Sequence, residues 1–220
     1  MERSPLTKMR VCWGLGGTNY CKNMVYDGCE ITRFDAHQGL CNGKIINSKC
    51  SYINLIGYGE MLIENCLLEL KDPTMFQLRA DYGSTWEGEI IIRNCNVEPN
   101  EEVERKDTVY IMSLVWYNRP FGYVCHYPNI TLDNVRFTKR EVPIKLYMYD
   151  DDYSLKGFCP KSEPMLHKEI LSDGVTKNLN VTVPPKYVRV INNHGGHKYY
   201  APKLPVFENT EFEGFIMTEE

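Results

Sequence analysis

The sequence predicts an all-β protein built as a parallel β-solenoid, and three observations lead to that prediction. A short phrase of branched aliphatic residues, then Asn or Asp, then Cys recurs along the chain. The apolar segments are short, rich in β-branched side chains and bounded by Gly, Asn, Asp or Pro. No convincing amphipathic helix lies between them, which argues against alternating β-α-β units.

The repeated phrase sets the length of one coil. Its clearest copies are Ile-Glu-Asn-Cys ending at Cys66, Ile-Arg-Asn-Cys ending at Cys95 and Leu-Asp-Asn-Val ending at Val135. Earlier copies end at Cys29 and Cys50, and a weaker echo covers residues 177–183. The Asp or Asn positions 27, 47 and 65 are 20 and 18 residues apart, which matches one coil. The later steps of 29, 40 and 46 residues fit longer loops or second coils.

The residue types suit stacked strands joined by tight turns. Asn tolerates left-handed backbone and bonds its own main chain, so it fits a turn repeated in every coil. Coils stacked at about 4.8 Å would align these side chains into amide ladders, with the neighbouring Cys packed inward. A β-sandwich of hairpins would instead need two-residue turns of the Asn-Gly or Asp-Gly type. Within the clear repeats of residues 19–137 only Asp27-Gly28 and Asn42-Gly43 offer them, so the solenoid is favoured.

The repeated phrase resembles that of the right-handed parallel β-helix, or pectin-lyase-like, repeat proteins. These include pectate lyases, polygalacturonases and phage tail spikes. The resemblance covers residues 19–137, fades through 138–176 and touches 177–191. It implies a right-handed single-stranded parallel β-helix of about five to seven coils. The paired Asp residues and Gly-His-Gly turn of polygalacturonases are missing, and His194-Gly195-Gly196-His197 is only loosely similar, so their catalysis is not transferred.

The predicted organisation is one β-helix with a cap. Residues 1–191 form the helix, with loop insertions near 98–107 and 138–176, and residues 192–220 form an irregular C-terminal cap or tail. An open end of unpaired strands invites association, so each end needs cover. The short segment before the first coil predicts either a homo-oligomer or preceding coils packed on the N-terminal end, as in the C-terminal part of a longer protein.

The composition and charge of the chain limit the kinds of partner that we expect it to bind. The 220 residues carry a net charge of −4, which gives no general attraction to nucleic acid or to an anionic membrane. We find no secretory signal and no apolar stretch long enough to span a bilayer. The nine cysteines include no Cys-x-x-Cys pair, so we expect reduced, buried thiols without a metal or other cofactor.

A candidate site comes from aligning three segments on their terminal glycines, Gly39, Gly59 and Gly83. That alignment places four polar side chains on one exposed face, namely Asp35, His37, Arg79 and Asp81. Side chains two coils apart would be separated by about 9.6 Å, near the upper end of the carboxylate spacing of inverting glycosidases.

Each residue of this face has an expected role. Asp35, His37 and Asp81 are the candidate catalytic acid and base groups. The remaining residues would bind substrate: Arg79 would hold a sugar carboxylate, and sugar rings would lie on the flat or polar side chains that follow, Tyr58, Tyr82, Trp86 and Glu87.

The expected function is therefore a carbohydrate-binding or carbohydrate-processing module that acts on an acidic polysaccharide. If the chain is an enzyme, it is a polysaccharide hydrolase or lyase. The alternative is a non-catalytic structural or adhesive module, such as part of a phage tail spike or a surface-protein stalk.

Overall fold

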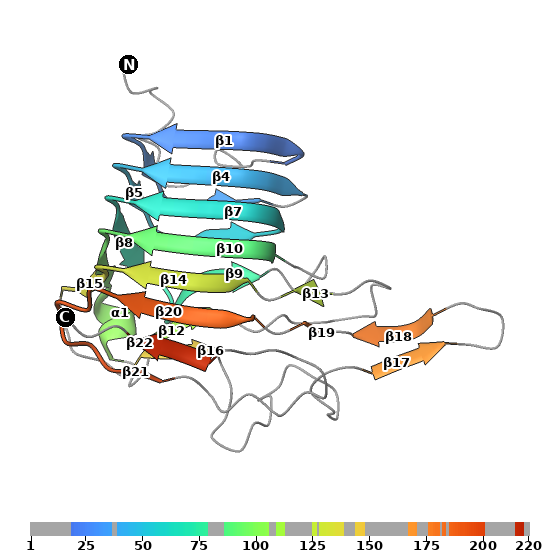
Figure 1. Ribbon diagram of the computed structural model, residues 1–220. Helices are drawn as coiled ribbons and strands as arrows, with labels where there is room; N and C mark the ends of the chain where they lie inside the picture. The colour runs from blue at the N-terminus through green and yellow to red at the C-terminus, as the bar shows by residue number, and fades with distance from the viewer. Residues whose placement is uncertain are drawn as a thin grey trace.

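The computed structural model describes residues 19–36, 39–78, 86–105, 109–112, 125–126, 128–138, 144–147, 167–170, 176–180, 182–183, 185–200 and 214–217. These residues form an all-β protein with three parallel sheets, and the strands of the largest sheet stack above one another (Figure 1). The chain visits the three sheets in turn and then begins the next layer, an arrangement consistent with a parallel β-solenoid.

The largest sheet has seven strands. In spatial order they are β1 (Cys21–Asp27), β4 (Leu40–Ile46), β7 (Gly57–Glu64), β10 (Trp86–Arg93), β14 (Asn129–Asp133), β20 (Tyr187–Ile191) and β22 (Gly214–Met217). Every neighbouring pair in this sheet is parallel.

The other two large sheets are also parallel. The five-stranded sheet holds β2 (Glu30–Ile31), β5 (Lys49–Cys50), β8 (Leu67–Leu70), β11 (Asn96–Pro99) and β15 (Arg136–Phe137). The six-stranded sheet holds β3 (Phe34–Asp35), β6 (Ile53–Leu55), β9 (Thr74–Leu78), β12 (Val109–Met112), β16 (Ile144–Tyr147) and β21 (Tyr199–Tyr200).

Smaller elements lie outside these layers. Strands β13 (Cys125–His126) and β19 (Thr182–Val183) pair in parallel, and β17 (His167–Ile170) pairs antiparallel with β18 (Thr176–Asn180). The one-turn helix α1 (Glu101–Glu104) lies within the insertion predicted near 98–107.

Within the range predicted as a cap, β21 and β22 extend the six- and seven-stranded sheets. No helix of the described residues is long and apolar enough to cross a membrane.

The core consists of columns of apolar side chains in register. In the seven-stranded sheet one such column runs through consecutive strands, and each member is at most 1% exposed: Ile45, Ile63, Ile92, Leu132 and Val190. Full burial of each aliphatic side chain contributes about 1.5–3 kcal/mol. The columns therefore hold neighbouring coils in one register.

The predicted asparagine turn is confirmed. The residue that follows each of the strands β1, β4, β7, β10, β14 and β20 has φ between 49° and 63°. These residues are Gly28, Asn47, Asn65, Asn94, Asn134 and Asn192. The register places Gly28, and not Asp27, in this column. The side-chain amides form the expected ladder: Asn134 Nδ2 donates to Asn94 Oδ1 over 2.9 Å, and Asn65 Nδ2 donates to Asn47 Oδ1 over 3.4 Å.

Cysteines next to this turn fill the interior, as predicted. Cys66 and Cys95 are 3% and 1% exposed, and the backbone N–H of Cys66 donates to Cys95 Sγ over 3.4 Å. Cys29, in the first coil, is only half-buried. Free thiols are found at Cys21, Cys29, Cys41, Cys50, Cys66 and Cys95.

Candidate functional site

The six-stranded sheet has a different register from the one that the glycines predict. Asp35 pairs with Asn54, and Asn54 pairs with Gln77. The glycine alignment paired Asp35 with Leu55 and Leu55 with Arg79, so it is wrong by one residue in each coil. The physical reason is that the connection from strand to glycine grows by one residue per coil, and Gly59 lies inside β7.

Two predicted site residues are not on the exposed face. Asp35 is only 5% exposed, although the prediction placed it on the surface. Trp86 is fully buried in β10, and its indole N–H donates to Gly59 O over 3.1 Å. The prediction that the Trp86 ring packs on a sugar is therefore wrong, because the ring packs in the core.

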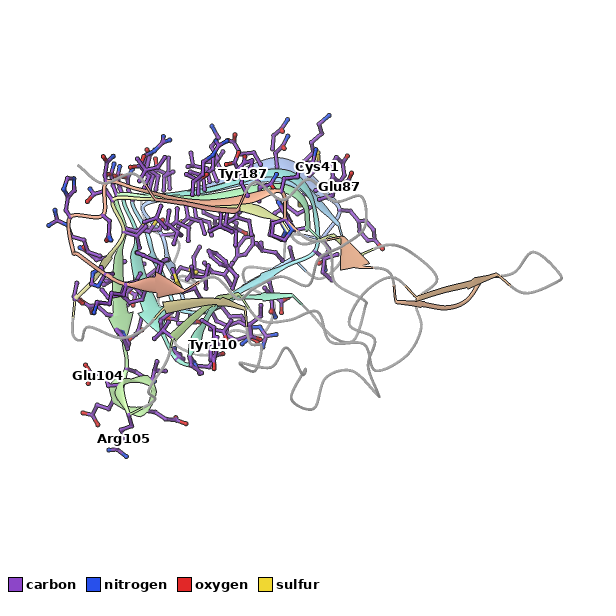
Figure 2. All side chains as sticks on the ribbon, turned by 60° about the horizontal axis from the view of Figure 1, so that its bottom comes forward. Cys41, Glu87, Glu104, Arg105, Tyr110 and Tyr187 are labelled. Carbon is purple, nitrogen blue, oxygen red and sulfur yellow. The ribbon has the colours of Figure 1, made fainter. Side chains whose placement is uncertain are left out.

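Other predicted residues have different outcomes. Tyr58 is 56% exposed and pairs in register with exposed Glu87 on the outer face of the seven-stranded sheet. A hydrogen bond with the Cys41 thiol raises the pKa of Tyr58. Figure 2 shows Cys41 and Glu87 on this outer face, together with Tyr187. Four predicted residues lie outside the described residues: His37, Arg79, Asp81 and Tyr82.

The corrected register brings together a polar cluster on the side of the six-stranded sheet that faces away from the core, where Asp35 and Asn54 are nevertheless buried. Asp35, Asn54 and Gln77 occupy one column on three successive strands, β3, β6 and β9. Their neighbours in the chain, such as Phe34 and Phe76, are buried on the inner side. We call the group the sheet cluster; its members are Arg33, Asp35, Tyr52, Asn54, Asp72 and Gln77.

One half of the sheet cluster is an ion pair. Arg33 Nε and Nη2 lie 2.9 Å and 2.7 Å from Asp35 Oδ2, and the two side chains are 26% and 7% exposed. The guanidinium carbon lies 5.0 Å from the centre of the Tyr52 ring, in cation–π contact. These contacts hold the Arg33 guanidinium between Asp35 and the Tyr52 ring.

The other half is a hydrogen-bonded chain. The Tyr52 hydroxyl donates to Gln77 Oε1, and Gln77 Nε2 donates to Asp72 Oδ2 over 2.5 Å. The backbone N–H of Thr74 donates to Asp72 Oδ1 over 2.8 Å. Burial raises the pKa of Asp72, although these hydrogen bonds act in the opposite direction. Burial, and next the charge of Asp72, raise the pKa of Tyr52, which keeps the phenol protonated as a donor.

Asn54 carries the one open acceptor of the sheet cluster that the described residues leave unsatisfied. Its side chain is 3% exposed, and Asn54 Oδ1 accepts no hydrogen bond there. Buried polar atoms are nearly always paired, and leaving one unpaired costs about 1–3 kcal/mol. Asn54 Oδ1 is therefore a buried acceptor whose capacity to accept a hydrogen bond is unused among the described residues.

Sequence reasoning missed five members of the sheet cluster: Arg33, Tyr52, Asn54, Asp72 and Gln77. A usable signal was present in the chain. Alignment on the large buried residues Phe34, Ile53 and Phe76, in place of the glycines, would have put Asp35, Asn54 and Gln77 in one column.

No family model, curated protein or solved structure matches the chain. Within the described part of the chain, no group of three or more His, Cys, Asp or Glu side chains is placed to hold a metal ion.

Proposed function

We propose that this chain is a carbohydrate-binding β-solenoid module that binds an acidic polysaccharide at the sheet cluster. The observation that carries the proposal is the buried, unsatisfied acceptor Asn54 Oδ1, which lies in an in-register polar column with Asp35 and Gln77. Polysaccharides present dense hydroxyl groups, each of which can donate to such an acceptor.

The acidic character of the ligand is argued from Arg33. A guanidinium is a planar donor whose geometry matches a carboxylate, and this one is partly exposed and held by Asp35 and Tyr52. A uronic acid carboxylate would share the Arg33 guanidinium with Asp35 while a sugar hydroxyl donates to Asn54. Arg79, which the sequence suggested as a substrate-binding cation, lies outside the described residues and remains a candidate.

The proposal extends from binding of the polysaccharide to its enzymatic cleavage. A carboxyl with a raised pKa is suited to donate a proton to a leaving group, and the half-buried Asp72 is such a group. His37 and Asp81 follow β3 and β9 in the chain and remain candidate acid and base residues. Hydrolysis and elimination both need these proton transfers.

We propose further that the solenoid is right-handed, with about five to seven coils, and related to the pectin-lyase-like proteins. Support comes from the parallel register of its sheets. Connections between parallel strands of one sheet are right-handed in nearly all proteins. A second copy, or preceding coils, would pack against the β1 edge.

A structural or adhesive module is the second candidate. The observation that favours it is the internal pairing of the sheet cluster: Arg33 bonds Asp35, and Tyr52 and Gln77 link to Asp72. A stalk that only needs a stable surface would also contain such pairs. It would have no use for the open acceptor on Asn54.

A glycan array with matched variants tests the proposal. Asn54→Leu removes the open acceptor at similar volume, so the variant should stay folded while its affinity for acidic glycans falls about tenfold or more. The control is Asn96→Ala, an exposed change on the five-stranded sheet, which should bind as wild type does.

Turnover is assayed on each glycan that binds. Asp72→Asn should bind normally and abolish turnover if the chain processes its ligand. Absence of binding to every glycan by folded wild-type protein would overturn the proposal and leave the structural module.

A further inference from the structure

A second candidate site lies on a different face, the outer side of the seven-stranded sheet. A hollow of about 570 Å³ opens there across the first three strands, β1, β4 and β7. Its polar lining consists of Asn23, Asn42, Lys44 and Glu60, and its apolar lining includes Met24 and Val25. None of these residues belongs to the sheet cluster.

The two asparagines hold a fixed arrangement. Asn42 Nδ2 donates to Asn23 Oδ1 over 3.0 Å, and Asn42 Oδ1 accepts from the backbone N–H of Glu60 over 2.9 Å. Both residues have φ of 55°, in the left-handed region. These bonds use the oxygens and leave the Asn23 amide hydrogens without a partner among the described residues.

Gly59 keeps Asn42 in place. A Cβ at Gly59, whose φ is +96°, would lie 2.0 Å from Asn42 Oδ1. Only glycine leaves room for this asparagine to bond the backbone of the next coil. The left-handed backbone at Asn23 and Asn42 and the glycine at position 59 thus fix the positions of the two side-chain amides in the absence of a ligand.

Opposite charges lie beside the ladder, with Lys44 on the same strand as Asn42 and Glu60 on the next strand. Lys44 and Glu60 are both exposed, and neither has an ion-pair partner among the described residues. They lie on adjacent strands, two positions apart in register, which separates their Cα atoms by about 8 Å. A ligand can therefore place an anionic group at Lys44 and a hydroxyl donor at Glu60 at the same time.

We propose that this hollow binds a single hexuronate unit. The carboxylate would accept from the Lys44 ammonium and the Asn23 amide, one hydroxyl would donate to Glu60, and the C–H face of the ring would lie against Val25. Val25 is 57% exposed, as such a contact requires. A neutral sugar leaves the Lys44 ammonium without a carboxylate, whereas a uronate engages Lys44, Asn23 and Glu60 together.

This inference deepens the proposed function, because it gives an acidic polysaccharide a second contact on another face. Tyr58, two residues before Glu60 and 56% exposed, extends the surface toward the next sugar. Two contacts on one polymer would raise its apparent affinity beyond that of either site, provided that the polymer reaches both.

The experiment is a titration of isotope-labelled full-length protein by NMR, with sodium glucuronate and sodium galacturonate as probes. Glucose and galactose are the neutral controls. Amide shifts should concentrate at residues 23–25, 42–44 and 60 with the uronates only. Lys44→Met should weaken binding about tenfold, Asn42→Gly should weaken it while tolerating the left-handed backbone, and the control Lys198→Met should match wild type.

The outcomes separate this inference from the proposed function. Uronate shifts at the hollow without polymer binding at the sheet cluster would support the hollow and overturn the proposed function. Polymer binding that Asn54→Leu abolishes and Lys44→Met leaves unchanged, with no uronate shifts at the hollow, would overturn the hollow and keep the function. Equal shifts with glucose would also overturn the uronate assignment.

Discussion

Replacement of Asn94 separates the two contributions of the asparagine turn to stability. Asn94 lies between β10 and β11 with φ of 51°, and its Oδ1 accepts from Asn134 Nδ2 over 2.9 Å. Its backbone N–H donates to Asp133 O over 2.9 Å, a bond that any residue keeps. A side-chain change therefore alters only the strain at the left-handed backbone and the amide bond.

The magnitudes follow from these two effects. Left-handed backbone costs a residue with a Cβ about 1–2 kcal/mol, and Asn tolerates it better than Ala. The exposed amide bond is worth about 0.5–1 kcal/mol. Asn94→Ala should therefore lower the free energy of unfolding by about 2 kcal/mol. Asn94→Gly relieves the strain and loses only the bond and some chain entropy, so about 1 kcal/mol is expected.

Urea unfolding followed by circular dichroism measures both variants. Asn96→Ala is the control, because Asn96 lies two residues away in β11, is exposed and has no left-handed backbone; it should stay within about 0.5 kcal/mol of wild type. Equal losses for the Ala and Gly variants at position 94 would refute the role assigned to the left-handed turn. So would an Ala variant as stable as wild type.

Three other predictions concern the core. Burial raises the pKa of Cys50 to about 12 from its usual value of 9.0. The stability that the neutral thiol contributes is therefore present below pH 9, and it falls by about 1.4 kcal/mol per pH unit as the pH rises toward 12. Cys50→Val should reduce this dependence of the free energy of unfolding on pH in urea titrations, and an unchanged dependence would contradict the assignment. Trp86→Phe should lower stability by about 1–3 kcal/mol through the lost bond to Gly59 and leave glycan affinity unchanged; weaker glycan binding by a folded variant would restore Trp86 as a ligand residue. Gly88→Ala, whose Cβ would lie 2.1 Å from Gly59 O, should cost at least about 2 kcal/mol by thermal unfolding, and a neutral effect would contradict the close approach of β7 and β10.

The parallel sheets were predictable because the physics that creates them is local and repeated. Asn tolerates left-handed backbone, so its position marks the turn; the residue after it faces inward, as Cys66 and Cys95 do. A turn that depends on the backbone preference of one residue can be recognised in a single sequence. The spacing between successive asparagines then gives the length of one coil.

The candidate site was less predictable, because register depends on the length of each connection. The connection from Asp35 to its glycine is shorter than the one from Asn54, and a shift of one residue moves a side chain to the other face of the sheet. Glycine was a poor reference, since Gly59 is required by Asn42 on the adjacent strand and does not end its own. The burial of Asp35 also depends on contacts between distant segments, which no local pattern encodes.

A crystal structure with a bound acidic oligosaccharide would decide where the glycan is recognised. The sheet cluster predicts a sugar hydroxyl within about 3.2 Å of Asn54 Oδ1 and a uronate carboxylate at Arg33. A structure in which Asn54 Oδ1 is satisfied by the protein itself, with the sugar bound elsewhere or absent at saturating concentration, would contradict it.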